Sequence, residues 1–274
     1  MPQLDKKQGV ERSAGQDAGR PASLVGEAGA NRAVSRRVSS VVSFAVSFLV
    51  AVGSIAAGAV IGGKAYVVVS AIVVLCSLVP FFVQFERRPP QAREVVLVAV
   101  MCALAVVARA AFVWVPHFKP MAAIVMVAGM GLGASSGFLV GSVSVLASNF
   151  IFGQGPWTPW QMLSFGLCGF VFGLLADKGV FPRGGLGWKR RIALALSGGL
   201  FVVLIAGPVL DTSSLFYLFS GITPETVFAV YAAGFPVNCI HGAATFATLL
   251  LVANPLLSQL ARVRKKYGLG TTGT

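Results

Sequence analysis

Charged residues are scarce in this sequence, and acidic residues are the scarcest. Its 274 residues contain 9 Asp and Glu against 22 Lys and Arg, and only 11% of the chain is charged while 56% is hydrophobic. Soluble globular domains carry about 25% charged residues. The composition therefore excludes an ordinary soluble enzyme and predicts an integral membrane protein.

Residue patterns for metal, redox or nucleotide chemistry are missing as well. The four cysteines lie in apolar segments without a Cys-x-x-Cys pair, and the chain has two histidines. Neither a disulfide framework nor a structural zinc site is predicted from these residues. The sequence also lacks a Gly-x-x-x-x-Gly-Lys-Ser/Thr stretch for binding ATP phosphates. We expect no cofactor.

Apolar runs long enough to cross a membrane, which takes about 20 residues, recur after residue 38. Residues 1–38 are rich in Gly, Ala and Ser with mixed charge, which predicts a disordered cytoplasmic tail rather than a secretory signal. The segments that follow predict an all-α polytopic protein with about eight spans, at residues 39–62, 66–85, 94–115, 120–134, 137–152, 160–176, 190–208 and 225–253.

The distribution of cations predicts the orientation of these spans. With the N-terminus inside, one side of the membrane holds nineteen of the 22 Lys and Arg, the other side keeps Lys64 and Lys119, and Arg109 lies within a span. Loops rich in Lys and Arg face the cytoplasm. We therefore expect a multi-pass protein of the cell membrane with both termini cytoplasmic. Topology accounts for the positive charge, so no nucleic-acid partner is expected. The outward loops are expected at residues 62–65, 116–120, 152–159 and 207–224.

One outward loop has an unusual composition. Residues 152–162, Phe-Gly-Gln-Gly-Pro-Trp-Thr-Pro-Trp-Gln-Met, contain two prolines, two glycines and two tryptophans. Pro and Gly favour a non-helical turn, and Trp is typical of the membrane interface. With the preceding Gly137–Phe150 run, this loop resembles the S components of energy-coupling factor (ECF) transporters, the membrane subunits that capture vitamins. The similarity is strong over about residues 86–180 and extends to the last two spans only in general plan.

The resemblance implies a fold and a function. S components have six helices, both termini inside and a pocket open to the outside, which matches the third to eighth spans here as a core at 94–256. Residues 39–85 are then an additional N-terminal transmembrane hairpin, and residues 257–274 a basic cytoplasmic tail. Family members bind a vitamin or related metabolite and work with a transmembrane coupling subunit and two ATPase subunits. The loop is most similar to chains of the cobalamin-type group.

Arg109 is the charged residue that most needs an explanation. A charge near mid-membrane costs about 2.5–3.5 kcal/mol on insertion scales. Its guanidinium either binds a carboxylate, phosphate or amide oxygen of the ligand, or extends to the outer headgroups. Lys119 and Phe118 lie in the first core loop, where Lys119 is either a partner for an acidic ligand group or an exposed lysine.

Uncharged polar and aromatic side chains supply further candidates for substrate binding. Asn149, Asn238 and His241 are polar groups in apolar surroundings, and they either contact the ligand or hydrogen-bond helices to one another. In the outward loop, the side chains of Trp157, Trp160, Gln154 and Gln161 either stack on and orient a ring system or anchor the loop at the interface.

Small residues at four-residue spacing predict close helix packing. Ala99 and Ala103 form such a step in the first core helix, where the resemblance implies contact with the coupling subunit. Steps of this kind are common in membrane helices, so the spacing alone does not indicate a partner contact. Glycines with the same spacing more simply pack spans of this chain together: Gly129, Gly133, Gly137, Gly141, Gly169 and Gly173.

These observations predict a substrate-capture subunit of an ECF-type uptake transporter and not an enzyme. Two alternatives stay open. An intramembrane enzyme would use Asp211, Glu225 or His241, although no spaced acid–base or metal motif accompanies them. A non-transporting sensor or scaffold would keep the fold without binding a coupling subunit.

Overall fold

The computed structural model describes residues 92–218 and 223–267, together with scattered helical positions between Val46 and Val79. The predicted tail at 1–38 and most of the predicted hairpin at 39–85 lie outside the described residues. The helices that the structure describes in full are α4 (Ala92–Ala111), α5 (Met121–Leu132), α6 (Ala134–Phe152), α7 (Thr158–Asp177), α8 (Trp188–Phe201), a π-helical segment (Val202–Ala206), α9 (Gly207–Leu218) and α10 (Pro224–Tyr267).

Five helical stretches of this part of the chain are long and apolar enough to cross a membrane. They are α4, α6, α7, the continuous run Trp188–Phe216, and α10. The predicted membrane helices are thus confirmed, whereas the full count of eight spans stays a prediction. The short helix α5 is covered by its neighbours, because eleven of its twelve residues are buried.

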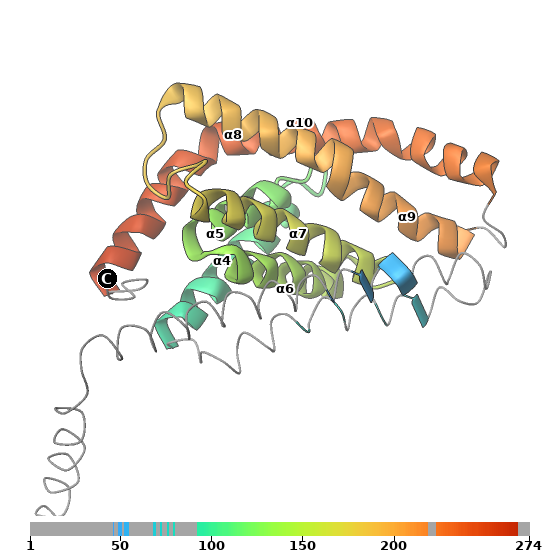
Figure 1. Ribbon diagram of the computed structural model, residues 1–274, viewed down its shortest axis with the longest axis horizontal. Coiled ribbons are helices and arrows are strands. Elements are labelled where there is room, and N and C mark those ends of the chain that lie inside the picture. The colour runs from blue at the N-terminus through green and yellow to red at the C-terminus, as the bar shows by residue number, and fades with distance from the viewer. Residues whose placement is uncertain are drawn as a thin grey trace, which may run out of the picture. The chain divides into compact units, whose positions relative to one another are not determined.

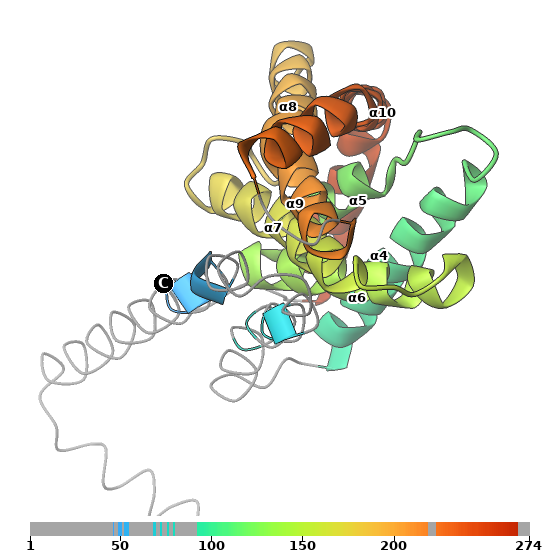
Figure 2. The same ribbon diagram turned by 90° about the vertical axis from the view of Figure 1, so that its right-hand side faces the viewer.

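The α5 and α7 helices lie at the centre of the bundle. In both Figure 1 and Figure 2 they lie between α6 on one side and α8 and α10 on the other. The apolar core accordingly contains residues of α4, α5, α6, α7, α8 and α10, among them Met126, Phe172 and Leu249.

The glycine steps explain how α5, α6 and α7 approach so closely. A Cβ atom built on Gly129 would lie 1.9 Å from the carbonyl oxygen of Gly169, and one on Gly137 would lie 2.4 Å from Cα of Gly129. A Cβ atom on Gly141 or Gly173 would also lie within 2.4 Å of backbone atoms. The predicted internal packing is therefore confirmed at these glycines. Gly133 differs, because its φ of 104° places it at the break between α5 and α6.

The predicted outward loop at 207–224 is wrong for residues 207–218, which continue the seventh span as α9. The polar run that suggested a loop is satisfied within the bundle. Asn238 donates to Asp211 at 2.6 Å, and the Thr212 hydroxyl lies 2.8 Å from the Tyr231 hydroxyl. A π-helical segment lies directly before Gly207, whose backbone N–H bonds the carbonyl of Val202.

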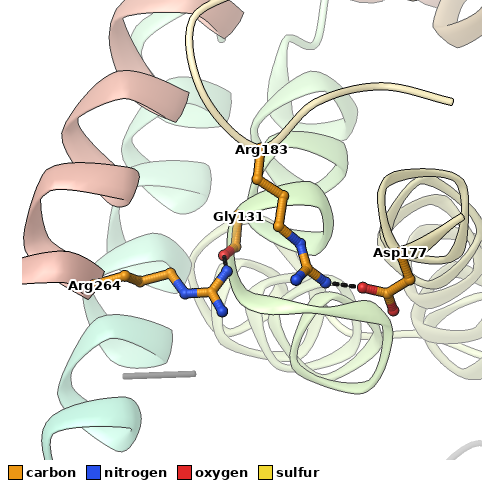
Figure 3. A network of polar contacts seen from close by, with 4 residues as sticks. All are labelled: Gly131, Asp177, Arg183 and Arg264. Carbon is orange, nitrogen blue, oxygen red and sulfur yellow. Dashed lines mark hydrogen bonds and ion pairs between the residues drawn. The ribbon is translucent and has the colours of Figure 1, made fainter. Parts of the chain in front are cut away.

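The helices alternate in direction, so the bundle has two distinct ends. At one end, α4 and α8 begin and α5, α7 and α10 finish. We call it the cation-rich end, because it holds Lys178, Lys189, Arg190, Lys265 and Lys266. At this end Arg264 donates to the carbonyl of Gly131 at 2.6 Å, and Arg183 pairs with Asp177 (Figure 3). Arg264 thereby satisfies a carbonyl at the end of α5. The opposite end, with the 112–120 and 153–157 loops, is the cation-poor end.

Candidate functional site

A small cavity lies between the α4–α5 loop, α7, the α8–α9 run and α10. Its polar lining consists of Lys119, Ser164, His241 and Thr245, and its apolar lining includes Phe165 and Leu210. The volume is about 20 Å³, which holds a water-sized group. A vitamin-sized ligand therefore fits only after the α4–α5 loop or the surrounding helices move.

Three basic side chains gather at this cavity. Among the described residues, the buried Nε2 atom of His241 has no hydrogen-bond partner. The ring of His117 lies 6.2 Å from that of His241, measured between centroids. Burial lowers the pKa of Lys119, and nearby Arg109 lowers it further. His117 has a φ of 57°, which is uncommon for a residue other than Gly. The α4–α5 loop thus brings two basic residues close to a third on α10.

Arg109 binds protein groups next to this cavity. Its Nη1 atom donates to the Ser148 hydroxyl at 2.6 Å and to Oδ1 of Asn149 at 2.8 Å. Its guanidinium carbon lies 4.9 Å from the ring centroid of Phe152. These contacts join α4 to the end of α6 and provide neutral partners for the cation.

The hydrogen bonds continue from Asn149 into the outward loop. Its amide nitrogen donates to Thr158 at 3.0 Å and to Oε1 of Gln161 at 2.8 Å. The Thr158 hydroxyl in turn donates to Gln154 at 2.9 Å. Four of the predicted site residues, Arg109, Asn149, Gln154 and Gln161, therefore belong to one network that fixes the α6–α7 loop.

The predicted aromatic residues occupy different environments. Trp160 is 1% exposed and stacks on Phe216 with centroids 5.6 Å apart, in a second apolar cluster. Its ring thus packs within the protein. Trp157 is partly exposed beside the loop, and Phe118 packs against Phe112 with centroids 4.9 Å apart.

The last span separates its two predicted polar residues. Asn238 is buried against α9, where its bond to Asp211 ties α10 to the neighbouring helix. A Cβ atom on Gly207 would meet the Asn238 side chain at 2.3 Å, so glycine allows this approach. His241 lines the cavity one turn further along the helix.

Sequence reasoning missed several polar residues of the site. Ser148 and Thr158 belong to the Arg109 network, while Ser164 and Thr245 line the cavity. One signal was available for Thr245, because it follows His241 by four residues and therefore shares its helix face. Ser164 carried no such signal, since its hydroxyl bonds the carbonyl of Ala206, 42 residues away.

Ala99 and Ala103 lie away from the cavity on a surface of α4. Both are exposed in the chain, as are Val96, Val100 and Leu104 on the same helix. Within the described part of the chain this step is therefore not used for internal packing, in contrast to the glycine steps.

Comparison with known protein families identifies the family of this chain. Residues 91–262 match the family described as "ECF-type riboflavin transporter, S component". The chain belongs to this family. The match covers α4 to α9 and most of α10, which confirms the resemblance to ECF S components. No curated protein and no solved structure gives a significant match.

Membership defines the class of function. The S components of ECF transporters are substrate-binding membrane subunits for vitamins and do not form an enzyme class. The cavity and the hydrogen-bonded loop of this S component both lie within the matched residues.

Proposed function

We propose that this S component captures a vitamin or related metabolite from outside the cell and delivers it through an ATP-driven ECF module. The single observation that carries the proposal is the cavity beneath the α4–α5 loop. There, an imidazole nitrogen of His241 without a hydrogen-bond partner among the described residues shares the lining with Lys119. A few polar groups in an apolar pocket are typical of small-molecule sites. The family description supports the same conclusion.

Two vitamins are the first candidates for the substrate. The family description names riboflavin, and the 152–162 loop resembles the cobalamin-type group. In the proposed site, Lys119 and His241 contact the ligand, and the network of Arg109, Asn149 and Gln161 holds the loop beside it. Binding opens the cavity by displacing the α4–α5 loop.

Binding by the purified protein tests this proposal. We expect wild-type protein in mild detergent to bind riboflavin or cobalamin, measured by flavin fluorescence quenching or corrin absorbance. His241→Ala should weaken binding about tenfold, because a buried hydrogen bond and its contacts are lost. Trp114→Ala is the matched control, since Trp114 is 91% exposed and should leave affinity unchanged. Equal loss in both variants would contradict the assignment of the cavity as the ligand site.

The proposed partners are a transmembrane coupling subunit and two ATPase subunits. The exposed Ala99 and Ala103 on α4 are the proposed contact with the coupling subunit, because small side chains let another helix approach closely. The proposed location is the cell membrane, with the cation-rich end in the cytoplasm.

Cysteine labelling tests this orientation. In a Cys239→Ser background, Gln154→Cys at the cation-poor end should react in intact cells with a maleimide that cannot cross the membrane. Lys178→Cys at the cation-rich end should react only after permeabilisation. Both positions are exposed, so accessibility does not differ between them. Labelling of both cysteines in intact cells would refute the orientation.

A further inference from the structure

The cavity gathers basic side chains without acidic residues to balance them. Lys119 and His241 line it, His117 packs against His241, and Arg109 is close enough to Lys119 to act on it electrostatically. The lining contains no Asp or Glu among the described residues.

The described ranges contain four acidic residues, and none of them lines the cavity. They are Glu94, Asp177, Asp211 and Glu225. Glu94 and Asp177 lie at the cation-rich end, where Asp177 pairs with Arg183. Asp211 accepts a hydrogen bond from Asn238, and Glu225 lies exposed in the first turn of α10. Among these four residues, the only ion pair is that of Asp177.

Among the described residues, neutral protein groups satisfy Arg109 but not the imidazole of His241 in the cavity. Ser148, Asn149 and the Phe152 ring surround the guanidinium. Within the described residues, the Nε2 atom of His241 has no such partner. Lys119, which lines the same cavity, is partly buried. Holding a partly buried ammonium without an opposite charge is unfavourable, and an anion placed beside it offsets that cost.

We propose that the substrate of this site carries an acidic group, a carboxylate or a phosphate, which binds between Lys119 and His241. The inference rests on the proposed function and narrows its substrate class. The lysine ammonium supplies the charge, and His241 donates a hydrogen bond through Nε2. The apolar remainder of the ligand then lies against the side chains of α7 and α9.

Pairs of compounds that differ in this group test the inference. The probes are pantothenate and panthenol, biotin and biotinamide, nicotinate and nicotinamide, pyridoxal phosphate and pyridoxal, and FMN and riboflavin. Calorimetric titration of the purified full chain gives an affinity for each. For the pair that binds, we expect the acidic compound to bind at least about tenfold more tightly than the neutral one. The reason is that a hydrogen bond to a charged group contributes more than one between neutral groups.

Two lysine variants connect this preference to the site. Lys119→Met should abolish the preference, whereas Lys119→Arg should keep it, and gel filtration checks that both are folded. Equal or tighter binding of the neutral member, or a preference that survives in folded Lys119→Met, would overturn the inference while leaving substrate capture intact. If Lys119→Met does not fold, Lys119→Gln replaces it, because this variant also removes the charge but keeps a polar side chain. Binding of neither member of any pair would overturn the inference, and a neutral metabolite that co-purifies with the protein, identified by mass spectrometry, would then preserve the proposed function.

Discussion

Gly169→Ala should strongly destabilise the protein, although alanine is the better helix former. The α6 and α7 helices cross at Gly137 and Gly169, and a Cβ atom on Gly169 would lie 2.1 Å from the carbonyl oxygen of Gly137. Backbone atoms on both sides leave no flexible side chain that can move aside. Overpacking costs about 1–3 kcal/mol or more, whereas helix propensity alone would stabilise the variant by about 0.5–1 kcal/mol.

Thermal unfolding in detergent measures this effect. We expect the midpoint to fall by at least about 5 °C, with aggregation in gel filtration. Gly184→Ala is the matched control, because a Cβ atom there meets nothing within 4 Å. A midpoint that rises in Gly169→Ala would show that α6 and α7 are further apart than described.

Ala99→Trp and Ala103→Trp should each abolish uptake while leaving ligand binding in detergent unchanged. Both alanines are exposed on α4, and Arg109, which joins α4 to the hydrogen-bonded network of the α6–α7 loop, lies further along the helix. An indole ring there would separate α4 from any partner helix that packs closely against the small side chains. Because such packing carries the association of membrane helices, its loss should remove co-purification with the coupling subunit.

A substitution on the same helix provides the control. Leu104 is also exposed but lies about 140° around the helix from Ala99. Leu104→Trp should therefore retain uptake and co-purification. Loss of ligand binding in parallel with docking would show that Ala99 and Ala103 serve the fold of the chain itself. Uptake that survives both alanine substitutions would rule out this face as the docking site.

Close packing and membrane insertion follow from local sequence, so they could be predicted. The apolar runs of α4, α6 and α7 were found because hydrophobicity over about 20 residues suffices to identify a span. The packing role of Gly129, Gly137 and Gly169 was likewise predictable, because glycines four residues apart lie on one helix face.

The continuation of α8 into α9 could not be predicted in the same way. Gly207, Pro208 and the polar residues after them are typical of a loop. Only tertiary structure supplies the partners, Asn238 and Tyr231 of α10, that satisfy Asp211 and Thr212 inside the bundle.

The sequence by itself determined that this protein lies in a membrane, where its main helices run and which family it resembles. Those properties depend on composition, on short-range periodicity and on a contiguous loop motif. The tertiary structure decided which polar groups meet. Arg109 contacts Ser148 and Asn149 about forty residues away, and Lys119 shares a cavity with His241 from the far end of the chain. Such contacts follow from how the helices pack, and no local pattern specifies which side chains that packing brings together.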